Sequence, residues 1–196
     1  MVRAHKLKRP LDPEMDHCQG APTASVNLVV YLDYECPLSE KANETLELLT
    51  MHLGPQIHLA VRHFPITKLH PNAMGAAEAA EAAAAQGRFW EMHALLFEHQ
   101  DALEPEHLLE YAHELRLDLP KFQTDLESAK YRPMIEEQMK EAKRSGVSHT
   151  PTFFINGVRY DGEYDRRSLM NALEEAARKA PRTFHDLEER PFLEMA

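Results

Sequence analysis

The sequence has few cysteines and no long apolar run. Cys18 and Cys36 are its two cysteines among 196 residues. That count excludes a scaffold held by several disulfides and suits a reducing compartment. No stretch approaches the 18 or more apolar residues that a membrane span needs, and the basic N-terminus has no apolar segment of the secretory kind. We therefore expect a cytoplasmic protein with no membrane partner.

Positive charge is also in the minority. The formal net charge is −10, which disfavours nucleic acid as a partner. The twelve histidines form neither an HExxH nor a His-x-His pattern, and neither cysteine has a Cys or His at metal-ligand spacing. We expect no bound metal and no nucleic-acid partner, while the oligomeric state is left open.

Hydrophobic patterning predicts a β-α-β unit in the first third of the chain. Residues 1–24 contain three prolines and no periodicity, which indicates a tail and an approach loop. Strands are expected over 26–32 and 57–63, with a helix over 37–51 between them. Residues 25–66 should therefore form the first half of an α/β fold, with parallel strands joined by a right-handed crossover.

The rest of the chain is first helical and then mixed. Residues 67–145 predict an insertion of about five helices from their apolar periodicity. Residues 146–180 return to strand character at 152–155, and Asn156-Gly157 signals a hairpin to a further short strand. Asp165 is expected to cap the last helix.

This order of elements predicts an α/β fold with a mixed central sheet interrupted by an all-helical insertion. The composition of residues 181–196 predicts a polar tail. The tail carries four apolar side chains available for docking, namely Phe184, Leu187, Phe192 and Leu193.

A cysteine stands where the first predicted strand gives way to a helix, in Tyr31-Leu-Asp-Tyr-Glu-Cys36-Pro-Leu-Ser39. The backbone N–H groups and dipole of a helix N-terminus favour an anion such as a thiolate. Pro37 suits the first helical position, and Ser39 can turn its hydroxyl toward the sulfur. From placement alone, a reactive Cys36 and a small buried filler are equally good interpretations.

A second segment, Gly146-Val-Ser-His-Thr150-Pro151-Thr-Phe-Phe, leads into a later strand. Proline is permitted at the first residue of a strand. A cis Thr150–Pro151 bond would present the backbone of Thr150 to an extended substrate beside Cys36, and an ordinary trans proline is the alternative. His149 would stabilise a thiolate when protonated, although a surface histidine is the plainer interpretation.

These segments and further motifs in the same order resemble the DsbA-like branch of the thioredoxin superfamily over residues 16–180. The further motifs are Asp16-His17 with Gly20-Ala-Pro, His63-Phe-Pro-Ile, Leu69-His-Pro-Asn-Ala before an Ala-rich helix, and Gly87-Arg-Phe-Trp. The resemblance implies a thioredoxin fold with a helical insertion and a cis proline facing a reactive cysteine. It places Cys36, Ser39 and Pro151 in catalysis, and Pro37, Leu38, His149 and Thr150 in contact with substrate.

Ser39 departs from the Cys-x-x-Cys pattern of members that form disulfides. Without a second thiol, this motif cannot perform dithiol oxidation, but a monothiol can form a mixed disulfide that an external thiol releases. We therefore predict a thiol–disulfide oxidoreductase or isomerase with no bound cofactor. Glutathione as co-substrate, or a protein bearing a thiol or disulfide, is the expected partner. A variant engineered to trap the mixed disulfide would also carry serine at position 39.

Two other functions stay open. Glutathione-dependent isomerases or transferases of the kappa-like type use a serine at the helix start, but Ser39 lies one turn too late and Cys36 occupies that place. A binding module without redox turnover is the third interpretation. Cys18 is either inert or a distant resolving thiol, although a bridge requires its loop to fold back. Glu35 is either a proton shuttle or a solvated carboxylate.

Overall fold

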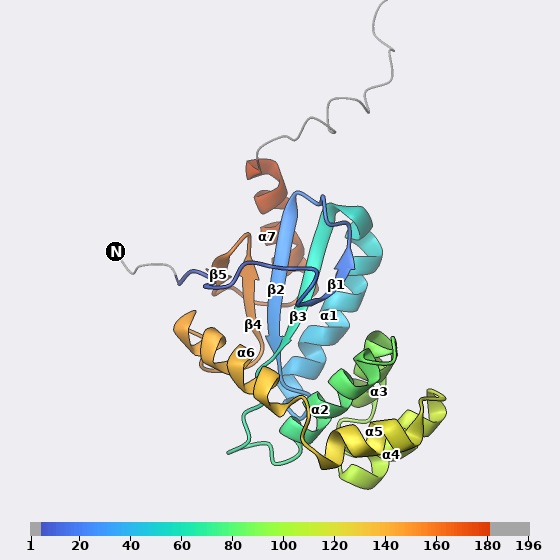
Figure 1. The fold of residues 1–196 in the computed structure, drawn as a ribbon. Coiled ribbons are helices and arrows are strands. Elements are labelled where there is room, and N and C mark those ends of the chain that lie inside the picture. The colour runs from blue at the N-terminus through green and yellow to red at the C-terminus, as the bar shows by residue number, and fades with distance from the viewer. Residues whose placement is uncertain (1–4, 181–196) are drawn as a thin grey trace, which may run out of the picture.

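A five-stranded mixed sheet forms the centre of the computed structural model, which describes residues 5–180 (Figure 1). The predicted tail 181–196 and its apolar side chains lie outside the described residues. Across the sheet the order is β1 (His17–Gly20), β3 (Ile57–His63), β2 (Val26–Leu32), β4 (Thr152–Ile155) and β5 (Val158–Tyr160). Strands β2 and β3 are parallel, and the other neighbours are antiparallel. The predicted mixed α/β sheet is confirmed.

The prediction of a tail and loop over residues 1–24 is wrong at His17–Gly20. These residues form β1, which pairs antiparallel with β3 and places Cys18 opposite Ala60. The sequence His-Cys-Gln-Gly has no apolar alternation, so the partner strand, rather than local propensity, makes it a strand. Residues before β1 are also paired, because Lys6 forms an isolated bridge with Val158 on β5.

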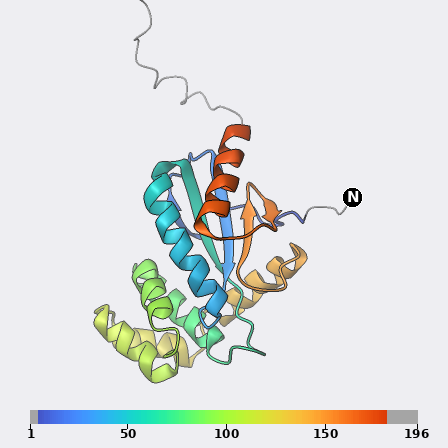
Figure 2. The same cartoon turned by 180° about the vertical axis from the view of Figure 1, so that it is seen from behind.

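Helices cover both faces of the sheet. On one face lie α1 (Pro37–Leu53), which a short 3₁₀ turn η1 (Gly54–Gln56) follows, and α7 (Arg166–Lys179) (Figure 2). On the other lie α6 (Arg132–Arg144) and the N-terminal segment (Figure 1). Strand β2 contributes Leu28 and Val30 to the larger core and Val29 and Tyr31 to the smaller one. Burial on both faces explains why its sequence is nearly all apolar.

The helical insertion lies between β3 and β4, beyond the end of β2 that leads to Cys36 (Figure 1). Its helices are α2 (Ala73–Ala84), α3 (Phe89–Glu98), α4 (Pro105–Glu114), α5 (Leu119–Glu127) and α6. Phe89 is buried in the main core and Trp90 packs against it. The insertion therefore shares the hydrophobic core of the sheet instead of forming a separate one.

The hairpin turn and the helix cap predicted in the second half of the chain are both present. Asn156 and Gly157 have φ of 48° and 75° and join β4 to β5, the left-handed conformations that a two-residue hairpin requires. The Asp165 carboxylate accepts hydrogen bonds from the backbone N–H groups of Arg167 and Ser168 at the start of α7.

A buried ion pair joins Asp16, the residue before β1, to Arg62 on β3. The Arg62 guanidinium donates to both carboxylate oxygens of Asp16, at 2.8 and 2.7 Å, and both side chains are fully buried. Arg62 also donates to the backbone oxygens of Arg9 and Pro10 and to the Tyr31 hydroxyl. Burial alone would raise the pKa of Asp16, but the hydrogen bond and charge of Arg62 outweigh burial and lower it. Arg62 thus connects the N-terminal segment to the sheet.

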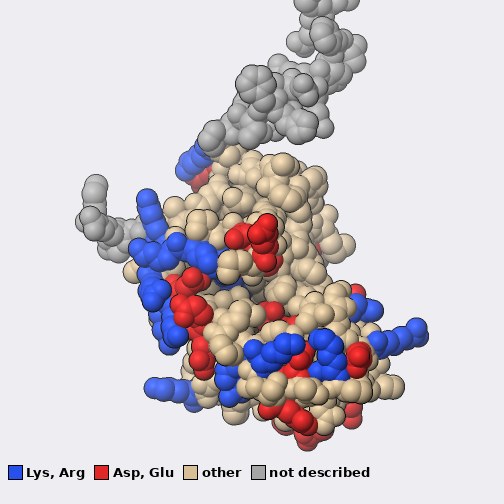
Figure 3. Space-filling model, in the orientation of Figure 1, with Lys and Arg blue, Asp and Glu red and all other residues tan. Residues whose placement is uncertain are grey.

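The outer surface carries charges of both signs. On the face shown in Figure 3, Lys and Arg side chains are interspersed with Asp and Glu, so neither sign forms a continuous field there. Of the helices within residues 5–180, none has the length and apolar character needed to cross a bilayer.

Candidate active site around Cys36

Cys36 is the N-cap residue of α1, directly beyond the end of β2. Its φ of −90° and ψ of 116° are extended, and Pro37 follows at the first helical turn, as predicted. The Cys36 carbonyl accepts from the N–H groups of Ser39 and Glu40, at 2.8 and 3.2 Å. The side chain is 7 % exposed. The sulfur is therefore at a helix N-terminus and mostly shielded from water.

The loop before β4 meets Cys36. The Cys36 Sγ lies 3.5 Å from the backbone oxygen of Thr150, and the Thr150–Pro151 peptide bond is cis. Pairing of β2 with β4 places Tyr31 opposite Thr152, which brings this loop to the end of β2. The buried Thr150 hydroxyl has no hydrogen-bond partner within residues 5–180. Two segments 114 residues apart thus form one site.

Ser39 is fully buried one turn into α1. Its hydroxyl oxygen accepts a hydrogen bond from the backbone N–H of Asp33, at 3.2 Å. The contact of Ser39 with the sulfur that the sequence suggested is not among the hydrogen bonds of the described residues. Ser39 instead ties the first turn of α1 to the chain leaving β2.

The turn that carries Cys36 is held from two sides. Gln100, in the connection between α3 and α4, donates from Nε2 to the backbone oxygens of Tyr34 and Cys36, at 2.7 and 3.1 Å. The buried Asp33 carboxylate accepts from the backbone N–H of Ile66 at 2.7 Å and pairs with His70 Nδ1 at 2.8 Å. The insertion therefore fixes the backbone that presents the cysteine. Sequence reasoning missed Gln100, and no local signal points to it.

Glu35 has a role that neither sequence interpretation predicted. Its carboxylate accepts from the backbone N–H of Asn72, at 2.6 Å, immediately before α2. A carboxylate at a helix N-terminus satisfies an unpaired N–H and complements the helix dipole. Glu35 is partly exposed, and its carboxylate links the active-site turn to the insertion through Asn72.

Behind the site, a buried chain of polar groups joins α1 to α3. The Tyr34 hydroxyl is 2.8 Å from His93 Nδ1, and His93 Nε2 is 2.8 Å from the Asn43 side-chain oxygen. Burial lowers the pKa of His93 to about 3, and the nearby His63 and His17 add to the lowering. The ring is therefore neutral at physiological pH, so it accepts from Tyr34 and donates to Asn43.

A small hollow of about 270 Å³ lies next to this site. Leu38, His149, Thr150, Pro151 and Tyr164 are among the residues that line it, so the structure brings together most of the predicted substrate contacts. Leu38 is half exposed. His149 is exposed and contacts Ser148 rather than the sulfur. Tyr164, from the loop before α7, was not predicted. Burial raises the pKa of Tyr164, and the neighbouring Cys36 raises it further.

Cys18 lies in a different environment from Cys36. Both cysteines are free thiols, and Cys18 packs against the smaller core beside Arg62. Burial raises the pKa of Cys18 to about 11, the Asp16 and Asp12 carboxylates add to the rise, and Arg62 opposes it. An inert thiol fits this environment better than a resolving one.

We expect iodoacetamide to alkylate Cys18 slowly at pH 7. The rate should rise about tenfold per pH unit up to the raised pKa, because the thiolate is the nucleophile. Mass spectrometry of a Cys36→Ser variant measures this rate, and urea-unfolded protein is the control. A folded-state rate that levels off near the free-thiol value of about 8.5 contradicts the prediction.

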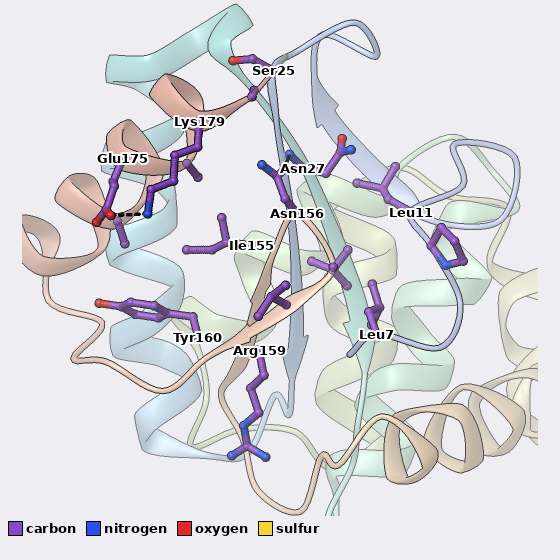
Figure 4. Close-up of a pocket in the computed structure, with 17 residues that line it drawn as sticks. Leu7, Leu11, Ser25, Asn27, Ile155, Asn156, Arg159, Tyr160, Glu175 and Lys179 are labelled. Carbon is purple, nitrogen blue, oxygen red and sulfur yellow. Dashed lines mark hydrogen bonds and ion pairs between the residues drawn. The ribbon is translucent and has the colours of Figure 1, made fainter. Parts of the chain in front are cut away.

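A larger hollow, of about 920 Å³, lies between the N-terminal segment, the β4–β5 hairpin and the end of α7 (Figure 4). Leu7, Leu11 and Ile155 give it apolar walls, and the Glu175–Lys179 ion pair lies at its edge. It contains no thiol, so its size does not make it the site of sulfur chemistry.

Comparison with known proteins agrees with the fold. The family model described as Thioredoxin matches residues 12–175, and this chain belongs to that family. A thioredoxin-like oxidoreductase from Silicibacter pomeroyi DSS-3 has a TM-score of 0.75 at 26 % identity, covering 92 % of this chain and 100 % of the other. The thiol-disulfide exchange protein α-DsbA2 from Wolbachia pipientis has a TM-score of 0.71 at 22 % identity, covering 82 % and 86 %. The predicted DsbA-like thioredoxin fold is confirmed.

This chain also resembles part of a longer protein. The Na⁺/H⁺ antiporter NhaA 1 of Mycolicibacterium gilvum (strain PYR-GCK) is 42 % identical over 171 residues, which are 86 % of this chain and 28 % of the relative. The chain therefore spans little more than a quarter of the length of that relative.

Proposed function

We propose that this chain carries out thiol–disulfide exchange through Cys36 as a single reactive thiol. The observation that carries the proposal is the sulfur of Cys36 at the N-terminus of α1, 3.5 Å from the Thr150 carbonyl, with Ser39 where a second thiol would stand. The similar fold of proteins described as an oxidoreductase and a thiol-disulfide exchange protein supports it.

In the proposed reaction the Cys36 thiolate attacks one sulfur of a disulfide in a protein or in oxidised glutathione. A new S–S bond forms to Cys36, the original S–S bond breaks, and the other sulfur leaves as a thiolate. An external thiol such as glutathione then attacks the mixed disulfide and frees Cys36. The cycle exchanges disulfide partners without a bound cofactor, and a cytosolic location would supply the external thiol.

The hollow beside Cys36 provides the surface for the substrate in this proposal. The exposed side chain of Leu38 offers an apolar contact, and the backbone of Thr150 beside the cis proline would pair with an extended substrate. Pro151 shapes the backbone next to the sulfur, and His149 lines the same hollow as Leu38. Pro37 starts the helix whose N–H groups face that charge.

The test is the intact mass of the protein after incubation with oxidised glutathione. We expect one glutathione adduct on wild type and on Cys18→Ala, no adduct on Cys36→Ser, and loss of the adduct when excess reduced glutathione is added. An adduct that persists in Cys36→Ser contradicts the assignment of the reactive thiol. A wild type that takes no adduct favours the binding-module interpretation.

A further inference from the structure

Two imidazoles and a carboxylate converge outside the Cys36 site. His17 on β1 and His63 at the end of β3 each place Nε2 near the same oxygen, Oε1 of Glu81 on α2, at 2.9 and 2.8 Å. The three ligand atoms all lie within 4.8 Å of one another. Glu81 Oε2 has no hydrogen-bond partner within residues 5–180.

The fold sets the position of each side chain independently. His17 is in register opposite Val61 on the neighbouring strand, and its ring stacks on Phe89 with centroids 3.5 Å apart. His63 is buried, and its backbone N–H donates to the Gln138 side chain at 3.0 Å. Glu81 is buried within α2. The His17 side chain is 24 % exposed, which leaves a route from solvent to the cluster.

We propose that His17, His63 and Glu81 form a binding site for a divalent transition-metal ion such as Zn²⁺. Two imidazole nitrogens and a carboxylate are a ligand set that such an ion takes, with a fourth position open to water. Bonds of about 2.0–2.2 Å place tetrahedral ligand atoms about 3.3 Å apart. The present distances from the two Nε2 atoms to Glu81 Oε1, 2.9 and 2.8 Å, are shorter. The ligand atoms must therefore move slightly apart to admit the ion, and a rotation of the Glu81 carboxylate that presents Oε2 would allow this.

The ion would take the place of the protons that the imidazoles now share with Glu81. Both rings then bind through Nε2 as neutral ligands, with their proton on Nδ1. Binding should therefore weaken at acidic pH. The competing explanation is that Glu81 serves solely as a hydrogen-bond acceptor that joins β1, β3 and α2.

A titration with Co²⁺, a spectroscopic substitute for Zn²⁺, separates the two explanations. The parent is the full chain with Cys18→Ala and Cys36→Ser, so that no thiol contributes. We expect one Co²⁺ per chain with visible d–d bands, and a rise in Tm with added Zn²⁺. His17→Ala should weaken binding by more than about tenfold, the smallest loss expected even for an outer-shell partner.

The matched control is His107→Ala. His107 pairs with Glu104 at 3.2 Å on the surface, so it has the same residue types without a third ligand, and its variant should bind Co²⁺ as the parent does. His17 is partly exposed at the edge strand β1, so its variant should fold, and circular dichroism checks this. A parent that binds no Co²⁺, or a His17→Ala variant with unchanged affinity, overturns the proposal and leaves Glu81 a hydrogen-bond acceptor.

Discussion

Ser39→Cys is expected to convert a protein that retains a glutathione adduct into one that releases it. Ser39 is buried on the first turn of α1, three residues from Cys36, and residues with this spacing share one face of a helix. The introduced thiolate would attack the Cys36 sulfur of the mixed disulfide, form an intramolecular S–S bond and expel glutathione as a thiolate. A tethered group reaches an effective concentration of about millimolar. Attack by the introduced thiolate should therefore be faster than attack by a free glutathione molecule present at micromolar concentration.

The readout is the intact mass after oxidised glutathione in a Cys18→Ala background. The Ser39→Cys variant should lose two hydrogens and carry no adduct, whereas the Ser39 parent should carry one. The Ser39→Ala control removes the same hydrogen bond from the Asp33 N–H without adding a thiol, so it should keep the adduct. An adduct retained on Ser39→Cys would mean that the two side chains do not meet.

Asp16→Asn should cause the largest loss of stability among the substitutions considered. The variant keeps the shape of Asp16 but leaves the guanidinium of Arg62 buried without its counter-charge. Breaking one partner of a buried ion pair typically costs about 3–5 kcal/mol of unfolding free energy. Because Arg62 also bonds the Arg9 and Pro10 carbonyls, β1 and the segment before it should loosen together. Urea unfolding followed by circular dichroism measures the change.

Acid titration gives a second measure of the same pair. The pKa of Asp16 is lowered in the folded protein, so its stabilisation is present above the unfolded-state pKa of about 3.9 and disappears as pH falls through the folded value. Asp16→Asn should lack this component. The control is Glu137→Gln, in an exposed pair with Lys140, which should cost no more than about 1 kcal/mol. Equal effects of the two substitutions would show that burial of the Asp16–Arg62 pair adds nothing.

The elements that are buried on both faces were predictable from the sequence. The predicted strands over 26–32 and 57–63 agree with β2 and β3 at both ends. Strand β2 is a nearly continuous apolar run, whereas β3 was predicted from its alternating pattern and also buries His58, Arg62 and His63. The proline and glycine signals at Pro37 and Asn156-Gly157 also act locally. Strand β1 escaped prediction because its pairing partner, not its own side chains, stabilises it.

The candidate active site was predictable in its two motif segments and not in what surrounds them. Cys36 and the Thr150–Pro151 loop were located through a family resemblance, since physical reasoning from residues alone left a reactive and a structural cysteine equally favoured. Gln100 and Tyr164 belong to segments without any motif. The histidines form no local ligand motif, yet His17 and His63, from two different strands, meet at Glu81.

By itself, the sequence determined the order of strands and helices from β2 onward, the position of a cysteine at a helix start, and the serine that removes a second thiol from that helix. Such features depend on backbone propensity and on burial periodicity within a few residues. Only the tertiary structure decided which distant groups meet: Gln100 with the Cys36 carbonyl, and His17 with Glu81, each 64 residues apart. The physical reason is that strand order and the packing of the insertion set these contacts, and no local pattern of side chains encodes either one.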